Sequence, residues 1–464
     1  MQTPSVWIGT GKGLARSFNG GSSWESFRSV PQFATPGVFA IDIQGDTIWA
    51  STGFTKQVDD KSIQTGSGYT YSTDNGTTWK HLPQTLDQQG DSLQFYGNNI
   101  VKFLPVTVPE QNVTFDLDID GSHIWIASWS SGLRRLDNWD SSWKRIVLPS
   151  DQRNSISPND TLMNYYINPV PQDNFKVFSV FAQTDSIIWA GSAGGINKST
   201  DGGLSWSKFT TLNQQAHILG NWVIAIKGQQ LSSTYRLWCT DWKGNTELVP
   251  NQEFGVSYTD DGGRIWNNFL QGIKAYDFAF KDSITYVATD DGIYRTADGG
   301  RSWIRSGTII DKTTGQRITS RSFFSVGVMN DTVYCGGGDG LVKTTDNATH
   351  FFGESWEIQR AYRPVGASAT TYAYPNPFSP AQEIVRLHYG TTGIPVSTTI
   401  EIFDFGMNRV RTVIKDAQRS GMQDYDEIWD GRDDAKNQVT NGVYFYRVVL
   451  NNGDPIWGKV MVLE

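Results

Sequence analysis

A short phrase recurs along this chain of 464 residues and constrains its fold more than any other feature. It contains an Asp-x-Gly turn and ends in tryptophan. It reads STDNGTTW at 72–79, STDGGLSW at 199–206, TDDGGRIW at 259–266 and TADGGRSW at 296–303. A near copy, SFNGGSSW at 17–24, has Asn19 in place of the aspartate. Repetition on this scale means that one supersecondary unit is copied many times.

Each phrase lies in a longer unit of four short β-strands. Residues 38–84 contain the alternating runs VFAIDIQ, TIWAS, YTYST and TWKHL, separated by turns rich in Gly, Asp and Asn. Alternation with a period of two between such turns predicts antiparallel strands joined by hairpins. Four-strand units repeated at about 40–50 residues are typical of the blades of a β-propeller.

Seven copies of the unit can be aligned: 6–27, 38–84, 115–147, 178–209, 222–269, 276–304 and 323–358. We therefore predict an all-β protein with a seven-bladed propeller over residues 1–365. The first copy begins at its second strand, so closing the ring requires an inner strand from elsewhere. The simplest source is the stretch after Tyr362.

The repeated phrase resembles the Asp box, or bacterial neuraminidase repeat, of sialidases, xyloglucanases, sortilin-type receptors and photosystem assembly propellers. The resemblance implies that the box lies between the third and fourth strands of a blade, away from the working face. The carboxylate can accept hydrogen bonds from turn N–H groups, and the indole can pack between strands. We therefore assign a structural role to these residues: Asp74, Asp201, Asp261, Asp298, Trp79, Trp206, Trp266 and Trp303.

A second domain is predicted for residues 366–464. The repeat stops near Ala361, and the proline-rich run YPNPFSP at 374–380 cannot continue a sheet. The β-rich runs that follow include TTIEIFD, RVRTVI and GVYFYRVVL. Six or seven short strands in about ninety residues suit a small β-sandwich.

This C-terminal segment resembles the immunoglobulin-like domain of flagellar hook-capping proteins and the related sorting domain of the type IX secretion system. The matching motifs are YPNPFSP, IEIFDFGMNRVR, WDGRDDAKNQVTNGVYFYRV and GKVMVLE, with Lys436 at a turn position where the family usually has glycine. The resemblance implies export across an outer membrane and attachment to the surface or release from it. A stabilising β-module without a sorting role is the alternative.

Composition narrows the range of partners. The net charge of −8 is spread over both predicted domains, so we expect no nucleic-acid partner and no anionic membrane surface. No apolar run is long enough to span a bilayer. Cys239 and Cys335 lie in the second strands of different blades, where we expect no disulfide. We predict no cofactor.

The long insertions share one face of the predicted ring. They lie between the second and third strands (53–67 and 241–254) or between blades (86–99, 150–174 and 306–320), on the side opposite the Asp boxes. Long loops on a rigid scaffold commonly carry binding sites. The aromatic residues of this face are Trp129, Trp242, Tyr96, Tyr165 and Tyr166. They could stack on sugars or anchor a protein partner, or they could pack the loops onto the ring.

The same face has acidic residues: Asp59, Asp60, Asp87, Asp91, Asp160, Glu247 and Glu253. A glycosidase needs two carboxylates at a defined separation, and spacing in the sequence does not pair any of these. The run DLDIDG at 116–121 matches the start of a calcium loop. Its alignment with the repeat instead makes it an inner strand and turn, so we predict no metal site.

These features favour an exported protein of the cell surface or exterior of a Gram-negative, Bacteroidota-like bacterium. The leading hypothesis is a non-catalytic binding or structural role toward a polysaccharide or a surface protein. The C-terminal domain would engage outer-membrane secretion or attachment machinery. The alternative is a secreted glycoside hydrolase of the xyloglucanase or sialidase type.

Overall fold

The computed structural model describes residues 4–33, 37–58, 61–121, 123–137, 142–244, 249–313, 315–318, 320–360, 371–381, 383–391, 395–420 and 424–463. Within these residues the fold is all-β. There is no α-helix, and the helical segments in this part of the chain are two single 3₁₀ turns, η1 (Pro31–Phe33) and η2 (Asp173–Phe175). The prediction of an all-β protein is confirmed.

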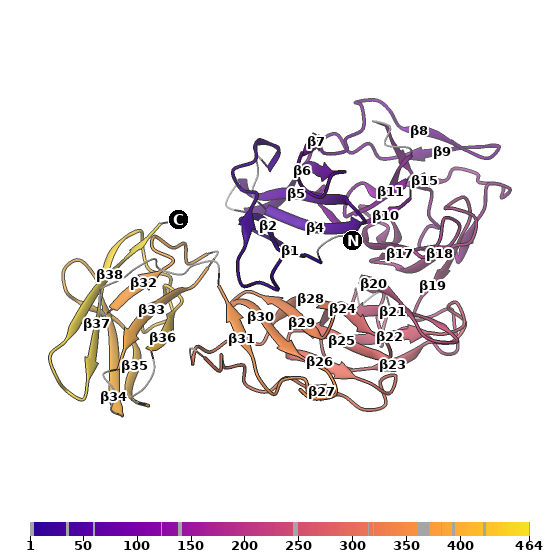
Figure 1. Cartoon of the computed structure of the whole chain (residues 1–464). Coiled ribbons are helices and arrows are strands. Elements are labelled where there is room, and N and C mark those ends of the chain that lie inside the picture. Colours follow the sequence, from indigo (N-terminus) through magenta and orange to yellow (C-terminus); the bar gives the residue numbers. More distant parts are fainter. Residues whose placement is uncertain are drawn as a thin grey trace. The chain divides into compact units, whose positions relative to one another are not determined.

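The seven repeated units each form one antiparallel sheet in the described part of the chain (Figure 1). The first has three strands, β1(Val6–Thr10), β2(Gly13–Ser17) and β3(Glu25–Ser26). The others have four strands in sequence order: β4(Gly37–Gln44), β5(Thr47–Val58), β6(Lys61–Ser72) and β7(Lys80–Leu82); β10(Thr114–Asp120), β11(His123–Ser128), β12(Gly132–Asp137) and β13(Trp143–Arg145); β16(Val177–Ala182), β17(Ile188–Ser192), β18(Gly195–Ser199) and β19(Trp206–Phe209); β20(Trp222–Gln230), β21(Tyr235–Trp242), β22(Gly255–Thr259) and β23(Asn267–Phe269); β24(Ala275–Lys281), β25(Ile284–Thr289), β26(Gly292–Thr296) and β27(Ile304–Arg305); β28(Phe323–Met329), β29(Thr332–Gly337), β30(Gly340–Thr345) and β31(Glu357–Gln359).

The first strands of the four-stranded sheets form the interior. Strand β4 packs on β10, β10 on β16, β16 on β20, β20 on β24 and β24 on β28. The second strands behind them are apolar and buried, as in β17, where all five residues are buried. The strand predicted to close the ring falls within residues 361–370, which lie outside the described residues, as does the predicted domain boundary at 365/366.

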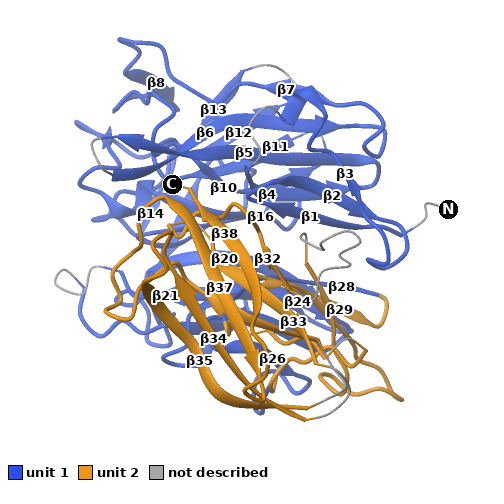
Figure 2. Ribbon diagram, turned by 90° about the vertical axis from the view of Figure 1, so that its left-hand side faces the viewer, with its two compact units in different colours: residues 1–305, 322–329 blue, residues 306–321, 330–464 orange. Residues whose placement is uncertain are grey.

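The chain divides into two compact units, coloured separately in Figure 2. The first comprises residues 1–305 and 322–329, and the second comprises residues 306–321 and 330–464. The aromatic and acidic groups discussed below belong to the first unit.

The long insertions contain strands of their own. The connection between β5 and β6 is an extension of both strands, so that each is 12 residues long. Strands β8(Leu93–Tyr96), β9(Asn99–Phe103) and β15(Tyr166–Ile167) form a separate small sheet in the order β15-β9-β8. Strand β14(Ser155–Ile156) adds to the edge of the β16–β19 sheet by pairing with β19.

The Asp boxes lie between the third and fourth strands of their sheets, as the resemblance implied. In the box at 199–206, the Ser199 hydroxyl accepts a hydrogen bond from the Gly203 N–H and donates to Asp201 Oδ1, both at 2.8 Å. The Asp201 carboxylate also accepts from the N–H and the hydroxyl of Ser205, at 2.8 and 2.5 Å. The Trp206 indole N–H donates to the Gly203 carbonyl at 3.1 Å. The turn is therefore closed by bonds within eight residues.

We expect Ser199→Ala to destabilise the protein by about 1–3 kcal/mol, because it leaves the buried Gly203 N–H without its acceptor. Urea unfolding of the variant measures this change. The control is Ser207→Ala, which removes an exposed hydroxyl from the adjoining strand β19 and should change the free energy of unfolding by less than about 0.5 kcal/mol. Equal stabilities for the two variants would contradict the role of Ser199.

The C-terminal strands form two antiparallel sheets. One has the order β32(Thr371–Tyr374), β33(Val385–Gly390) and β36(Asp424–Trp429). The other has the order β35(Arg409–Arg419), β34(Val396–Phe403), β37(Gly442–Leu450) and β38(Ile456–Val462). Side chains from both sheets, such as Leu387, Trp429, Ile402 and Tyr446, share one buried cluster. Lys436 has a φ of +69°, which explains why a glycine suits this turn position.

Candidate functional site

The predicted aromatic residues lie in two different environments. Trp129 directly follows β11 and Trp242 ends β21, and both are partly buried. Tyr96 and Tyr165 are only 8% and 7% exposed, and their hydroxyls donate to the carbonyls of Leu204 and Leu148. Tyr96 and Tyr165 therefore pack the inserted loops onto the sheets. Tyr166 is exposed, on the small sheet.

A repeated β-bulge places further aromatic rings at the start of the inner strands. The register with the second strand shifts at Phe39 in β4, Phe115 in β10, Phe178 in β16 and Tyr276 in β24. Phe324 holds the equivalent second position in β28. A bulge reorients its side chain relative to the pleat. The inner strands begin at the end of each sheet opposite the Asp box, so these rings lie at the same end as Trp129 and Trp242.

These residues form what we call the aromatic belt: Phe115, Trp129, Phe178, Trp222, Trp242, Phe254, Tyr276 and Phe324. On one side, Trp129 lies between Phe178 and Trp222, with ring centroids 5.5 and 5.9 Å away. Trp222 and Trp242 are paired in the register of β20 and β21, so their side chains lie on the same face of that sheet. On the other side, Tyr276 lies 5.3 Å from Trp242 and 5.2 Å from Phe324. The belt therefore extends over five consecutive sheets.

Lysine side chains lie over the rings of the belt. The Lys176 ammonium is 5.3 Å from the centroid of Trp129, and that of Lys274 is 5.4 Å from Trp242. Such contacts orient the indoles and place cations beside them. A surface with partly exposed aromatic rings and adjacent ammonium groups can stack on flat apolar faces and donate hydrogen bonds to a polar rim.

Below the belt, carboxylates of the inner strands bridge neighbouring sheets. Asp116 Oδ2 accepts from the Val180 N–H at 3.0 Å, and Asp277 Oδ2 accepts from the Val326 N–H at 2.9 Å. Asp42 and Asp118 form a second layer of the same kind, with the N–H groups of Ile119 and Ala182 at 2.8 and 2.7 Å. Asp116 and Asp118 of the calcium-like DLDIDG run thus bind backbone N–H groups of the next sheet. No group of three or more His, Cys, Asp or Glu side chains in the described part of the chain is arranged to hold a metal.

Burial and neighbouring charges shift the pKa values of these inner-strand groups. Desolvation, with the hydrogen bonds and Lys227 opposing it, raises the pKa of Asp116 to about 7, and burial also raises the pKa of Asp42 and Asp118. Burial lowers the pKa of Lys227, but the nearby carboxylate of Asp277, 2.7 Å away, outweighs it and raises that pKa. Lys227 keeps 45% of its side chain accessible to solvent.

We expect stability to increase as the pH is lowered from about 8 to about 5. The pKa of Asp116 is higher in the folded than in the unfolded chain, so its contribution is fully present below pH 3.8 and is lost as the pH rises through about 7. Between pH 8 and pH 5 the gain in stability from Asp116 amounts to about 3 kcal/mol. Below about pH 4 the trend should reverse, because hydrogen bonds from Thr78 and Ser302 lower the pKa of Asp74 and Asp298 to about 2. Urea unfolding at pH 8, 6.5, 5 and 3 measures this; a steady decrease from pH 8 to 5 would contradict it.

Three of the loop acids form side-chain contacts in the described part of the chain: Asp87, Asp160 and Glu253. Asp87 is buried between two guanidinium groups, Arg134 at 2.8 Å and Arg145 at 2.5 Å. Burial alone would raise the pKa of Asp87, but the two arginines lower it. Glu253 forms an exposed ion pair with Lys243 at 3.2 Å. Asp59, Asp60 and Glu247 lie outside the described residues.

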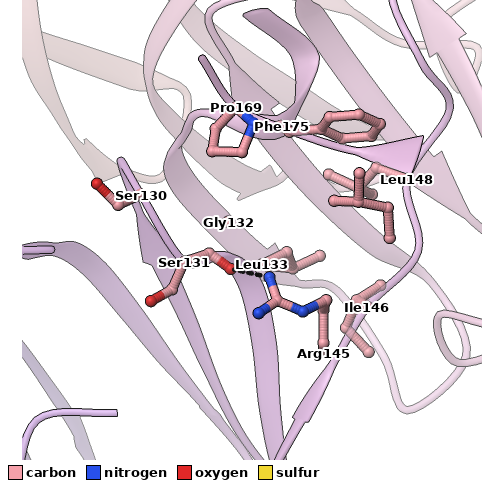
Figure 3. Close-up of a pocket in the computed structure, with 10 residues that line it drawn as sticks. Ser130, Ser131, Gly132, Leu133, Arg145, Ile146, Leu148, Pro169 and Phe175 are labelled. Carbon is pink, nitrogen blue, oxygen red and sulfur yellow. Dashed lines mark hydrogen bonds between the residues drawn. The ribbon is translucent and has the colours of Figure 1, made fainter. Parts of the chain in front are cut away.

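A small cleft adjoins the cluster of Asp87, Arg134 and Arg145 (Figure 3). Ser130 and Ser131, which follow β11, form one side, and Pro169 and Phe175 form the other. Arg145 lies at its base and donates to the Ser131 carbonyl at 3.3 Å. The arginine is therefore held by protein groups on two of its edges, and the cleft is a feature of loop packing beside the belt.

Six residues of the belt were not predicted from the sequence as parts of one surface: Phe115, Phe178, Trp222, Phe254, Tyr276 and Phe324. The available signal was the alignment of the repeats, in which an aromatic residue recurs as the second or third residue of the inner strand. The alignment does not show where these side chains point, because the bulge sets their direction.

The cysteines and the search for membrane-spanning helices concern the chain as a whole. Cys239 and Cys335 are both buried, and neither forms a disulfide. In the part of the chain that the structure describes, no helix has the length and apolar character needed to cross a membrane.

The fold can be identified by comparison with solved structures. No protein-family model and no curated protein sequence matches the chain. Among solved structures, an ancestral GH74 enzyme aligns with a TM-score of 0.52 and 14% identity, over 98% of this chain and 60% of that one. This similarity, together with the successive four-stranded sheets, shows a β-propeller fold.

Two other solved structures are more distant. PorZ, an essential bacterial surface component of the type IX secretion system of Porphyromonas gingivalis, aligns with a TM-score of 0.34 and 13% identity, over 98% of this chain and 63% of that one. YCF48 from Cyanidioschyzon merolae has a TM-score of 0.44 and 15% identity, over 73% of this chain and 90% of that one. The chain thus spans less than two thirds of the length of the PorZ and GH74 structures.

Proposed function

We propose that this protein is a non-catalytic binding protein of the bacterial cell surface or exterior, and that its ligand rests on the aromatic belt. The observation that carries the proposal is the belt itself. Trp129, Trp242 and Tyr276 lie at the same end of their sheets with partly exposed rings, and Lys176 and Lys274 lie beside the two indoles. Rings gathered at the loop end of a rigid scaffold suit a polysaccharide or the surface of a protein.

The acidic groups support binding over catalysis. Asp87 is neutralised by two arginines, and Asp116 and Asp277 hold adjacent sheets together. A glycosidase would require two available carboxylates about 5 to 9.5 Å apart. A glycoside hydrolase of the xyloglucanase or sialidase type is the competing proposal, and the fold similarity to the GH74 enzyme is what favours it.

For residues 366–464 we propose an immunoglobulin-like sorting or attachment domain that engages outer-membrane secretion machinery. The two sheets with one shared core suit such a domain, as does the YPNPFSP run. The variant Lys459→Glu with Met461→Asp alters exposed positions of β38 without touching its buried face. In a bacterium with type IX secretion, the full chain should reach the surface and this variant should stay in the periplasm; equal export would contradict the proposal.

The binding proposal is tested by incubating the purified chain with plant β-glucans, sialylated glycans, bacterial polysaccharides and intact cells. Mass spectrometry detects released oligosaccharides, and sedimentation with the polymer or cells measures retention. We expect retention without product. A released oligosaccharide would favour the glycoside hydrolase instead.

We expect Trp129→Ala combined with Trp242→Ala to weaken retention at least tenfold, since each indole is a large partly exposed contact. Lys274→Ala is a milder variant that removes an ammonium from the belt and leaves the rings in place. The control is Phe18→Ala, which deletes an exposed ring from the Asp-box end of the first sheet. Thermal unfolding verifies that the variants are folded. Unchanged retention in folded belt variants would show that the ligand binds elsewhere.

A further inference from the structure

The small sheet β15-β9-β8 has an unusual outer face. Its inner face is formed by Tyr96, Val101, Phe103 and Ile167, which are all buried in one core cluster. Residues opposite each other in paired strands share a face. Phe95 pairs with Ile100, and Lys102 pairs with both Leu93 and Tyr166, so these five residues form the outer face. Four of them are large and apolar or aromatic.

This outer face is open to solvent. Phe95 is 81% exposed, Ile100 58%, Leu93 54% and Tyr166 41%. Taking about 200 Å² for each fully exposed side chain, the four residues present roughly 500 Å². The patch is therefore as large as the largest found on most monomeric proteins, and such patches commonly mark interaction sites. The β8–β9 pair is antiparallel, and an antiparallel pair that is covered on one side would ordinarily carry polar residues on the other.

Met163 extends the patch. The Leu162 N–H donates to Asn99 Oδ1 at 3.0 Å, which holds this loop beside the start of β9, and Met163 next to it is 84% exposed. With Met163 the patch reaches roughly 650 Å². Two copies placed face to face would bury about 1,300 Å² in total, within the range of specific protein interfaces.

Charge is arranged in a self-complementary way on the patch. Lys102 lies at the rung farthest from the β8–β9 turn. At the turn end, the Asn99 amide donates to the Asp160 backbone carbonyl at 2.8 Å, which places Asp160 there. Its carboxylate accepts from the Ser157 N–H at 3.0 Å and lies 3.8 Å from the Arg153 guanidinium, and 35% of the side chain stays accessible to a second cation. A two-fold axis through the Phe95–Ile100 rung exchanges the two ends. It would bring Lys102 of each copy toward Asp160 of the other.

We propose that this face, formed by Leu93, Phe95, Ile100, Lys102 and Tyr166, is a homodimer interface. Two copies associate through it about a two-fold axis, with Phe95 and Ile100 at the centre and Lys102 and Asp160 at the rim. Two sheet faces can stack at about 10 Å, which suits flat apolar surfaces of this kind. Strand β8 lies at the periphery of the first unit in both views (Figures 1 and 2), and the exposure of Phe95 and Ile100 leaves the outer face open to a partner. This inference is independent of the proposed binding function.

Sedimentation velocity of the full chain between about 1 and 100 µM tests the proposal. We expect a concentration-dependent dimer in the wild-type protein and at least tenfold weaker association in Phe95→Asp and in Ile100→Asp. The matched control is Leu212→Asp, which places the same charge at a leucine that is 67% exposed in another loop. It should dimerise as the wild type does. Thermal unfolding checks that each variant is folded.

A charge exchange tests the arrangement of the two copies. Lys102→Glu alone should weaken the dimer, because each new carboxylate faces Asp160 of the other copy, and adding Asp160→Lys should restore it. A wild-type protein that stays monomeric at 100 µM would overturn the proposal and leave the face to a different partner. A dimer that survives Phe95→Asp would equally overturn it, and failure of the charge exchange to restore association would overturn the two-fold arrangement.

Discussion

Replacing Asp87 with alanine should destabilise the protein by about 3–5 kcal/mol, because it leaves two buried guanidinium groups without their carboxylate. The side chains of Asp87, Arg134 and Arg145 are 7%, 4% and 7% exposed. The Asp87 carboxylate also accepts the Val106 N–H at 2.8 Å, which would lose its partner as well. Urea unfolding of the full chain measures the change.

Two comparisons sharpen this prediction. Arg145→Met should cost less than Asp87→Ala, since it leaves a neutral pair between Asp87 and Arg134 rather than two unpaired cations. Asp91→Ala removes an exposed carboxylate from the same loop and should have little effect on stability. If Asp87→Ala were within 1 kcal/mol of the wild type and still bound ligand poorly, Asp87 would belong to a functional site instead.

The second large effect is expected at the Asp-box tryptophans, which should not behave alike. Trp206 is 2% exposed and belongs to the large core cluster that also contains Trp125 and Tyr96. Its replacement by alanine should cost about 3–5 kcal/mol. Trp303 occupies the same position in its box but is only partly buried. Trp303→Ala should therefore destabilise the protein less, by about 2–3 kcal/mol, because less of the Trp303 side chain is removed from water on folding.

Thermal and urea unfolding of both variants measure this difference, and Trp303→Phe, which keeps an aromatic ring, is the conservative control. Equal losses at the two positions would mean that the box motif sets stability by itself. A larger loss at Trp206 would show that the neighbouring sheet determines how much each tryptophan contributes.

The blades could be predicted because their signals are local. Alternation in the run VFAIDIQ predicts β4, and the hydrogen bonds of Ser199, Asp201 and Ser205 close a turn within eight residues. The inserted β8–β9 hairpin was not predicted as a separate sheet, because its third strand, β15, comes from a loop more than sixty residues later.

The candidate site could be predicted only in part. The alignment of repeats predicted that Asp116 and Asp118 belong to an inner strand, and the structure places both in β10. It also placed Trp129 and Trp242 at the same end of their sheets. It could not distinguish them from Tyr96 and Tyr165, whose burial results from the packing of long insertions.

The sequence by itself determined the repeated four-strand unit, its Asp-box turns and the end of each unit at which long loops emerge. These depend on hydrogen bonds and side-chain alternation between residues close in the chain. Only the tertiary structure decided that Asp87 pairs with arginines 47 and 58 residues away, that eight rings form one belt, and that Phe95 faces solvent. The physical reason is that burial and charge pairing depend on which sheets become neighbours, and that is a property of the packed molecule.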